Sequence, residues 1–149
     1  MKILVINGPN LNMLGIREKH LYGSLSYEKI VQLIMDEGKK RNIAITCLQS
    51  NYEGDLVSWI QEAYFENYDG IIINPGAYTH TSIALLDAIK AVAPLPVVEV
   101  HLTDTDKREA FRKQSYMRTA CIATIKGHQQ QGYIEAMDII VKHLEDSKK

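Results

Sequence analysis

Apolar residues along the chain follow two alternating patterns. Short, largely apolar runs lie at residues 3–6, 43–48, 70–73, 96–100 and 120–125. Between these runs, apolar residues recur every three or four positions, as at Leu56, Ile60 and Ala63, which is the spacing of one buried helical face. The pattern therefore predicts five strands that alternate with helices.

The predicted strands indicate a particular kind of sheet. The isoleucines at 71–73 form a run that is apolar on both faces, which is typical of a parallel sheet covered by helices on each side. We therefore expect an α/β three-layer sandwich with a flavodoxin-like, five-stranded parallel sheet. Such sheets bind ligands beyond the carboxyl ends of their strands, near the point where the strand order reverses. Candidate site residues are thus expected in segments 7–24, 74–82 and 101–112.

Composition limits the size, the partners and the location. With 149 residues, 46% of them hydrophobic, the chain is expected to form one domain over 1–149. The 17 lysines and arginines nearly balance 18 acidic residues, so no long-range attraction to nucleic acid or membranes is expected.

Cys47 and Cys121 form neither a CxxC pair nor a disulfide framework. No secretory signal or membrane span of roughly 20 residues is visible, so the expected location is the cytoplasm.

The segment after the first predicted strand is unusually long. Gly8, Pro9, Gly15 and Gly23 are expected to prevent regular structure there, while several leucines make it too apolar for a solvated linker. Long irregular loops in compact domains are usually functional. We therefore expect an active-site lid loop at about residues 8–24.

The absence of several common sequence motifs argues against particular kinds of site. The chain has no Walker A sequence, no GxGxxG after the first strand, no HExxH and no GxSxG. A phosphate-accepting receiver domain would need acidic residues after strands one and three, where this chain has Asn7 and Asn74. Nucleotide, zinc and phospho-relay sites are therefore not favoured.

The five histidines differ in where they lie. His20, His128 and His143 are interpreted as surface or structural residues. His101 directly follows the apolar run at 96–100, at the strand end where this architecture places its chemistry. Glu99 lies two residues earlier on the same strand face, where its carboxylate could hold one ring nitrogen of His101. His101 is therefore a candidate catalytic residue.

Three arginines are candidates for a charged site. Arg17 lies near Tyr22 in the long loop; the pair could be a solvated arginine with a packed tyrosine, or an arginine that stabilises a phenolate. At about 4 Å and an effective dielectric near 20, that attraction is about 4 kcal/mol, enough to make Tyr22 a usable base near neutral pH. Arg108 and Arg112 are four residues apart, so one helical turn would form either an anion clamp or a solvated surface.

The order of these residues resembles a known family. Residues 7–18 read Asn-Gly-Pro-Asn-Leu-Asn-Met-Leu-Gly-Ile-Arg-Glu, followed by Tyr22 and Gly23, which is similar to the opening signature of the type II 3-dehydroquinate dehydratases. Further blocks match in order at 49–54, at 73–82 running to Asp87, and at 99–102 with 108–112. Residues 131–133 resemble the start of the family's last helix. The resemblance covers nearly the whole chain.

The resemblance implies a reaction of the shikimate pathway. It is the anti elimination of water from 3-dehydroquinate, through an enolate, to 3-dehydroshikimate, with no metal, Schiff base or organic cofactor. By resemblance, Tyr22 removes the proton beside the ketone, and Arg17 keeps Tyr22 ionised. Asn10 helps to hold the enolate through water. His101, oriented by Glu99, protonates the departing hydroxyl.

The resemblance also implies substrate contacts and an assembly. The substrate-binding residues are then Asn74, His80, Arg112 and the backbone amides of Leu102 and Thr103. Asp87 is similar to the family residue that reaches a neighbouring subunit's site, which fits a homododecamer of four trimers. Asp104 and Asp106 depart from the family pattern and add negative charge near the expected anion site, which affects the expected affinity rather than the reaction.

Two other interpretations remain at this point. A flavodoxin-like scaffold could instead bind flavin or another small anion. A catalytically silent family member could serve in a structural assembly, although the presence of Arg17, Tyr22 and His101 argues against that. The sequence leaves open whether the reaction serves aromatic amino-acid biosynthesis or quinate breakdown.

Overall fold

Five parallel strands form the centre of the molecule. The computed structural model describes residues 1–16, 18–22 and 25–149, with only the backbone of Lys19 and Tyr22. The strands are β1 (Lys2–Asn7), β2 (Ala44–Gln49), β3 (Gly70–Asn74), β4 (Val97–His101) and β5 (Ala123–Lys126). They are hydrogen-bonded in parallel in the order β2-β1-β3-β4-β5. The predicted flavodoxin-like sheet is confirmed.

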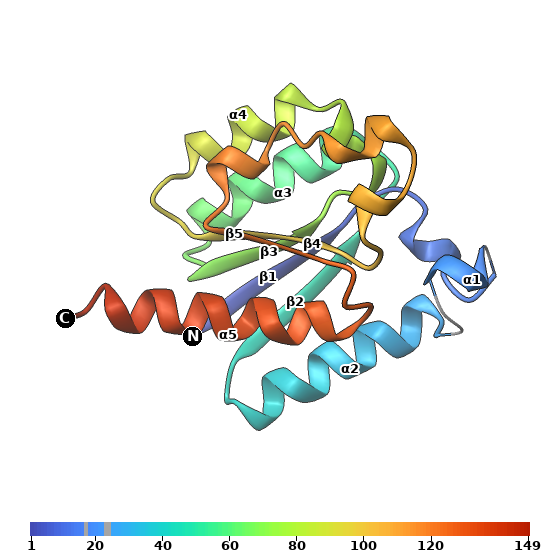
Figure 1. Cartoon of the computed structure of the whole chain (residues 1–149). Coiled ribbons are helices and arrows are strands. Elements are labelled where there is room, and N and C mark those ends of the chain that lie inside the picture. The colour runs from blue at the N-terminus through green and yellow to red at the C-terminus, as the bar shows by residue number, and fades with distance from the viewer. Residues whose placement is uncertain (17, 23–24) are drawn as a thin grey trace.

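Helices cover both faces of this sheet (Figure 1). α2 (Tyr27–Lys40) and α5 (Gln131–Asp146) lie on one face, and α3 (Glu53–Phe65) and α4 (Ile83–Ala91) lie on the other. Successive side chains of β1 point to opposite faces, so Ile3 packs with α2 and α5 while Leu4 packs with α3 and α4. Two hydrophobic cores result, and the predicted three-layer sandwich is confirmed.

Serine hydroxyls define the start of two helices. Ser26 accepts a hydrogen bond from the Lys29 amide at 3.3 Å and caps α2. Ser82 accepts from the Leu85 amide at 2.9 Å and caps α4, because the first amides of a helix have no partner within it. Thr81 instead ends the short 3-10 helix η2 (Gly76–His80). Ser82, and not the preceding Thr81, is therefore the N-cap of α4.

The segment after β1 contains more regular structure than its glycines predicted. It includes the 3-10 helix η1 (Leu11–Met13) and the single turn α1 (Lys19–Tyr22). Leu11 and Leu14 are buried in the core cluster that contains the α2 side chains. This packing compensates for the glycine content, so the segment is held against the body of the protein at Leu11 and Leu14.

The chain between β4 and β5 is a series of short turns. It contains the 3-10 helices η3 (Thr105–Lys107), η4 (Ala110–Lys113) and η5 (Arg118–Ala120). The fifth strand therefore begins at Ala123, later than the apolar run starting at residue 120 suggested. Within the described parts of the chain, no helix has both the length and the apolar character to cross a bilayer.

Candidate active site

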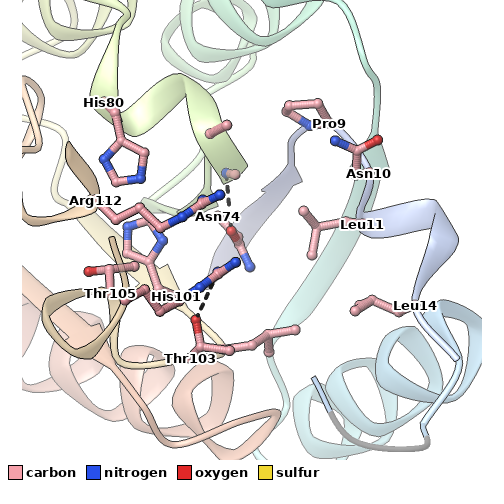
Figure 2. A pocket seen from close by; sticks show the side chains of 14 residues that line it. Pro9, Asn10, Leu11, Leu14, Asn74, His80, His101, Thr103, Thr105 and Arg112 are labelled. Atoms are coloured by element: carbon pink, nitrogen blue, oxygen red, sulfur yellow. Dashed lines mark hydrogen bonds between the residues drawn. The ribbon is translucent and has the colours of Figure 1, made fainter. Parts of the chain in front are cut away.

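A cavity lies at the carboxyl ends of β1, β3 and β4 (Figure 2). His80, His101 and Arg112 stand on one side of it, Asn10 and the leucines of the β1 loop stand on the other, and Asn74 lies between them. The cavity thus occupies the position where sheets of this order bind ligands. Seven of the residues expected at a site line it: Asn10, Asn74, His80, His101, Leu102, Thr103 and Arg112.

Glu99 and His101 form a buried pair at the end of β4. Glu99 is fully buried, His101 is 5% exposed, and His101 Nε2 lies 2.5 Å from Glu99 Oε2. Because an ionised carboxylate only accepts hydrogen bonds, Nε2 is the donor, and Nδ1 is the nitrogen left for a ligand in the cavity. The contact that the two-residue spacing predicted is present, and it fixes the orientation of the ring.

Three further side chains surround the Glu99 carboxylate. Ser115 Oγ donates to Oε1 at 2.8 Å, Thr79 Oγ1 donates to Oε2 at 3.1 Å, and Arg118 Nη2 lies 3.6 Å from Oε2. Burial alone would raise the pKa of Glu99, but the bond from His101 and the contacts with Ser115 and Arg118 outweigh it, so the pKa of Glu99 lies below its usual value. Glu99 is therefore a carboxylate at neutral pH.

A chain of buried hydrogen bonds orients Asn74. Its Nδ2 donates to the Tyr133 hydroxyl at 3.1 Å, and that hydroxyl donates to Asn7 Oδ1 at 2.6 Å. Asn7 Nδ2 in turn lies 3.4 Å from the Tyr27 hydroxyl, and Asn74 Oδ1 accepts from the Gly76 amide at 3.2 Å. Since each amide oxygen and nitrogen has a defined partner, Asn74 presents its second N–H group in a fixed orientation at the cavity.

His80 is held as a neutral ring. Its Nδ1 lies 2.6 Å from the Gln114 carbonyl oxygen, which can only accept, so Nδ1 carries the hydrogen. Burial lowers the pKa of His80, and the positive charges of His101 and Arg112 lower it further, against the opposing effect of the Gln114 carbonyl. At neutral pH, His80 Nε2 is therefore an acceptor suited to a substrate hydroxyl.

Two arginines bring positive charge to the cavity. Arg112 lies over the Phe111 ring, with its guanidinium carbon 5.1 Å from the ring centroid, and its Nε donates to Glu109. Arg108 donates through Nη1 to Thr103 Oγ1 at 3.4 Å. The single α-helical turn considered for these residues does not form, because they lie in and before the 3-10 helix η4. Both arginines nevertheless line the cavity, so an anion fits there.

The two aspartates that depart from the family pattern are engaged elsewhere. Asp104 caps η3 by accepting from the Asp106 amide at 3.1 Å, and Asp106 forms an ion pair with Lys126. That pairing is the main cause of the lowered pKa of Asp106. Neither aspartate is among the residues that line the cavity, so neither carboxylate forms part of its wall.

Polar residues of the β2–α3 segment hold the loop that carries Asn10. The Asn10 backbone amide donates to Asn51 Oδ1 at 3.0 Å, and Gln49 Nε2 donates to the Gly8 carbonyl at 3.2 Å. Gly8 itself must lack a side chain, because a Cβ there would lie 2.6 Å from the Pro75 carbonyl oxygen. The block at 49–54 was recognised in the sequence without a role, and these contacts provide one.

The remaining expected site residues lie elsewhere or cannot be placed. Asp87 is exposed on α4 and does not line this cavity. Arg17 lies outside the described residues, and of Tyr22 only the backbone, at the end of α1, is described. Gln129, which the sequence did not single out, donates through Nε2 to the Leu21 carbonyl at 3.1 Å and through its backbone amide to the Leu102 carbonyl at 2.9 Å. It connects α1 to the wall of the cavity.

Other chemistry is not supported by the described side chains. Burial raises the pKa of the Cys47 and Cys121 thiols to about 12, so both are protonated and weakly nucleophilic at neutral pH. The described residues include no cluster of three or more histidine, cysteine or acidic side chains that could hold a metal ion. The chemical groups at the cavity are therefore one buried acid–imidazole pair, the His80 ring, amides, threonine hydroxyls and guanidinium groups.

Comparison with known proteins gives a consistent result. The family model described as "Dehydroquinase class II" matches residues 1–141. The chain is 54% identical to a 3-dehydroquinate dehydratase of Clostridium perfringens, over 97% of this chain and 98% of that protein. It is 57% identical to one from Clostridium beijerinckii, over 92% and 93% of the two chains. The crystal structure of a type II dehydroquinase from Butyrivibrio crossotus superimposes with a TM-score of 0.94 at 50% identity, covering 95% of this chain and 97% of that one. The chain therefore belongs to the class II dehydroquinase family.

Proposed function

We propose that this protein is a type II 3-dehydroquinate dehydratase, a hydro-lyase that converts 3-dehydroquinate to 3-dehydroshikimate and water. The family membership and the names of the relatives support this activity. The single observation that carries it is the buried Glu99–His101 pair at a cavity that also contains arginines. That arrangement provides a proton donor next to a binding site for a carboxylate.

His101 is the proposed general acid. In its protonated form, Nε2–H remains bound to Glu99 and Nδ1–H is available for the departing hydroxyl. As the carbon–oxygen bond breaks, the bonding electrons leave with the oxygen, and the Nδ1 proton converts hydroxide into water. The ring that remains is the neutral tautomer with its hydrogen on Nε2. Glu99 stabilises that tautomer, because it accepts the same hydrogen bond before and after the transfer.

Tyr22 is the proposed base, and Arg17 the group that keeps it ionised. The phenolate removes a proton from the carbon beside the ketone, which gives an enolate whose collapse expels the hydroxyl. Asn10, which lines the cavity, is proposed to hold the enolate oxygen through water. The support for these roles is the family pattern at residues 7–23 together with the position of α1, whose Leu21 carbonyl is bound by Gln129.

The other cavity residues are proposed to bind the substrate in its ground state. Arg112 and the amides of Leu102 and Thr103 hold the carboxylate, because guanidinium and backbone N–H groups are its natural partners. Asn74 donates to a hydroxyl, and neutral His80 accepts from one. The single-domain protein then covers its substrate with the segment at about 8–24, which we propose as the lid.

Assembly and location are part of the same proposal. Asp87 and Ile83 lie one helical turn apart on α4, and both are exposed, with Ile83 at 55%. An apolar side chain beside a carboxylate suits a subunit contact at which Asp87 reaches a neighbouring site, as in a homododecamer of four trimers. The cytoplasm and the shikimate pathway are the expected setting.

The proposed activity is tested by adding 3-dehydroquinate to chelator-treated protein and following the ultraviolet absorbance of the conjugated product. We expect turnover by the wild-type chain and a loss of at least about 100-fold in His101→Gln. His143→Gln, on α5, is the matched control and should retain full activity. A folded wild-type protein that forms no product would contradict the proposal, and purified protein that retains a flavin would favour a small-anion or flavin-binding module instead.

A further inference from the structure

Arg118 is a charged residue that the proposed mechanism does not yet use. It begins η5, between η4 and β5, and its Nη2 lies 3.6 Å from Oε2 of the buried Glu99 carboxylate. The same oxygen accepts the hydrogen bond from His101. Arg118 is not among the residues that line the cavity. It therefore reaches the acid–imidazole pair from outside the space that the substrate would occupy.

The position of Arg118 is not explained by its own hydrogen bonding. Its side chain is 33% exposed, yet its Nε is buried without a hydrogen-bond partner among the described residues. Leaving a guanidinium N–H group unsatisfied costs free energy, and an arginine on the surface could avoid that cost. The ion pair with Glu99 is the favourable contact that offsets it.

Several other charged or titratable groups act on this pair. They comprise His80, Arg112 and Cys121, with Arg108 in the cavity wall. The ion pair of Asp106 with Lys126 also lies nearby: Lys126 is the register partner of His101 in β5, and the charge of Arg118 helps to lower the pKa of Asp106. Burial lowers the pKa of His80 and raises the pKa of Cys121 to about 12, so both are neutral near pH 7. Arg108 and Arg112 line the cavity, where a substrate carboxylate would neutralise their effect. Among the described residues, Arg118 is then the cation that stays with Glu99 when substrate is bound.

We propose that Arg118 is a positioning residue for the Glu99–His101 pair: by sharing Glu99 Oε2 with His101, it limits how tightly Glu99 holds the imidazolium. A lone buried carboxylate would stabilise protonated His101 strongly and so make it a poor acid. A second cation at the same oxygen weakens that attraction while keeping Glu99 ionised. The proton of His101 is then easier to release to the leaving group. This inference rests on the proposed general-acid role of His101.

The test removes the charge of Arg118 and measures proton affinity directly. In Arg118→Met, the midpoint pH at which the Glu99–His101 pair loses its proton should rise by about one pH unit. That shift is the low end of the effect of a neighbouring charge. Exchange of the His101 ring Cε1 hydrogen with deuterium oxide, followed by mass spectrometry across pH, reports that midpoint without requiring activity. The alkaline limb of the kcat/KM profile for 3-dehydroquinate should shift upward by the same amount, while its acidic limb stays in place.

Two further variants separate the role of Arg118 from general effects. Arg118→Lys keeps the charge and should shift the midpoint by less than half as much. Arg41 lies between α2 and β2 and pairs with Glu37 and Asp138. Arg41→Met removes the same charge there and should leave the midpoint unchanged. If Arg118→Met does not fold by circular dichroism, Arg118→Gln provides the same loss of charge.

The possible outcomes are distinct. An unchanged exchange midpoint in a folded, charge-free variant would overturn the inference. An equal shift in Arg41→Met would also overturn it, because the effect would then be one of net charge. A shifted midpoint in a protein that does not dehydrate 3-dehydroquinate would support the electrostatic role of Arg118 and reject the proposed function.

Discussion

Arg112 is the residue that we propose to hold the substrate carboxylate, and its side chain is already restrained. Its guanidinium lies over Phe111 and donates to Glu109, so part of its conformational freedom is lost before any ligand arrives. A substrate carboxylate carries its charge in both the ground and the transition state, so contacts to it strengthen binding without accelerating the chemical step.

Arg112→Ala should therefore raise KM by roughly 10- to 100-fold and lower kcat much less. Steady-state kinetics with 3-dehydroquinate measure both constants. Lys113→Ala removes the same charge from the next, exposed residue of η4 and should leave KM near the wild-type value. A fall in kcat with unchanged KM in Arg112→Ala would assign Arg112 to the transition state instead.

Glu99, which we propose to orient the general acid, should also contribute to stability. Its pKa is depressed in the folded protein, so the ionised form stabilises the fold above the unfolded-state value of about 4.3. That contribution is lost as the pH falls through the lower, folded-state pKa. Glu99→Gln removes charge-assisted bonds from a fully buried group and should cost at least about 2 kcal/mol at pH 7.

The difference in unfolding free energy between Glu99→Gln and wild type should narrow as the solution is acidified below about pH 4. The unfolded wild-type chain binds a proton at Glu99 there, and the folded protein follows at its lower pKa. Thermal unfolding of both proteins between pH 3 and 7, followed by circular dichroism, checks this. A difference in melting temperature that stays constant over this range would show that the carboxylate charge is not what stabilises the fold.

Residues close together in sequence were the easiest to predict. The contact between Glu99 and His101 follows from the two-residue repeat of a strand, and the structure contains it. The contacts of Glu99 with Ser115 and Arg118 were not predicted, because they depend on how the turns after β4 fold back over that strand. No local pattern in the sequence specifies that packing.

At the scale of elements, the chain after β4 was predicted least well. A helical turn over Arg108 and Arg112 did not form, because residues 103–109 are mostly polar and offer no apolar stripe to bury. Asp104 instead caps a three-residue turn. The two arginines still line the cavity, because the chain leaves β4 at the edge of the sheet where the site lies.

The start of α5 also contributes to the site from a distance. Tyr133 is buried between Asn7 and Asn74 and connects the ends of β1 and β3. Tyr133→Phe preserves the ring but removes the partner of Asn74 Nδ2 and of Asn7 Oδ1, so it should lower the free energy of unfolding by about 1–3 kcal/mol.

Because Asn74 would then lose its fixed orientation, Tyr133→Phe should also raise KM for 3-dehydroquinate several-fold. Urea unfolding and steady-state kinetics measure the two effects. Tyr64→Phe is the control, since Tyr64 is 55% exposed on α3 and should change neither quantity. A stability loss with unchanged KM would limit Tyr133 to a structural role.

At the scale of the whole molecule, the parallel sheet explains how residues from distant parts of the chain meet. Every strand ends at the same edge, so residues after β1, β3 and β4 converge on one cavity. The sequence predicted this architecture because alternating apolar runs and helical stripes extend over the whole chain. An intersubunit role for Asp87 is expected only from the family resemblance, since no pattern within one chain specifies a contact between chains.

The exposed position of Asp87 on α4 leads to a prediction about assembly. If Asp87 completes a neighbouring subunit's site, light scattering should give a mass near twelve chains, and Asp87→Ala should raise KM roughly tenfold. Oligomers made only of Tyr22→Phe chains should be at least about 100-fold slower than wild type, because each lacks the proposed base. Neither variant alone contains a complete site.

Mixed oligomers of the two variants should regain activity. A site that combines Tyr22 from an Asp87→Ala chain with Asp87 from a Tyr22→Phe neighbour has both groups. Co-expressed oligomers that carry both tags should therefore have a higher kcat/KM than the weighted sum of the separate variants. The control mixes Tyr22→Phe with His101→Gln; the proposed mechanism assigns both groups to the same subunit, so no intact site should form. If the first mixture is only additive, or if a monomer has full activity, Asp87 does not act between subunits and each chain is a complete enzyme.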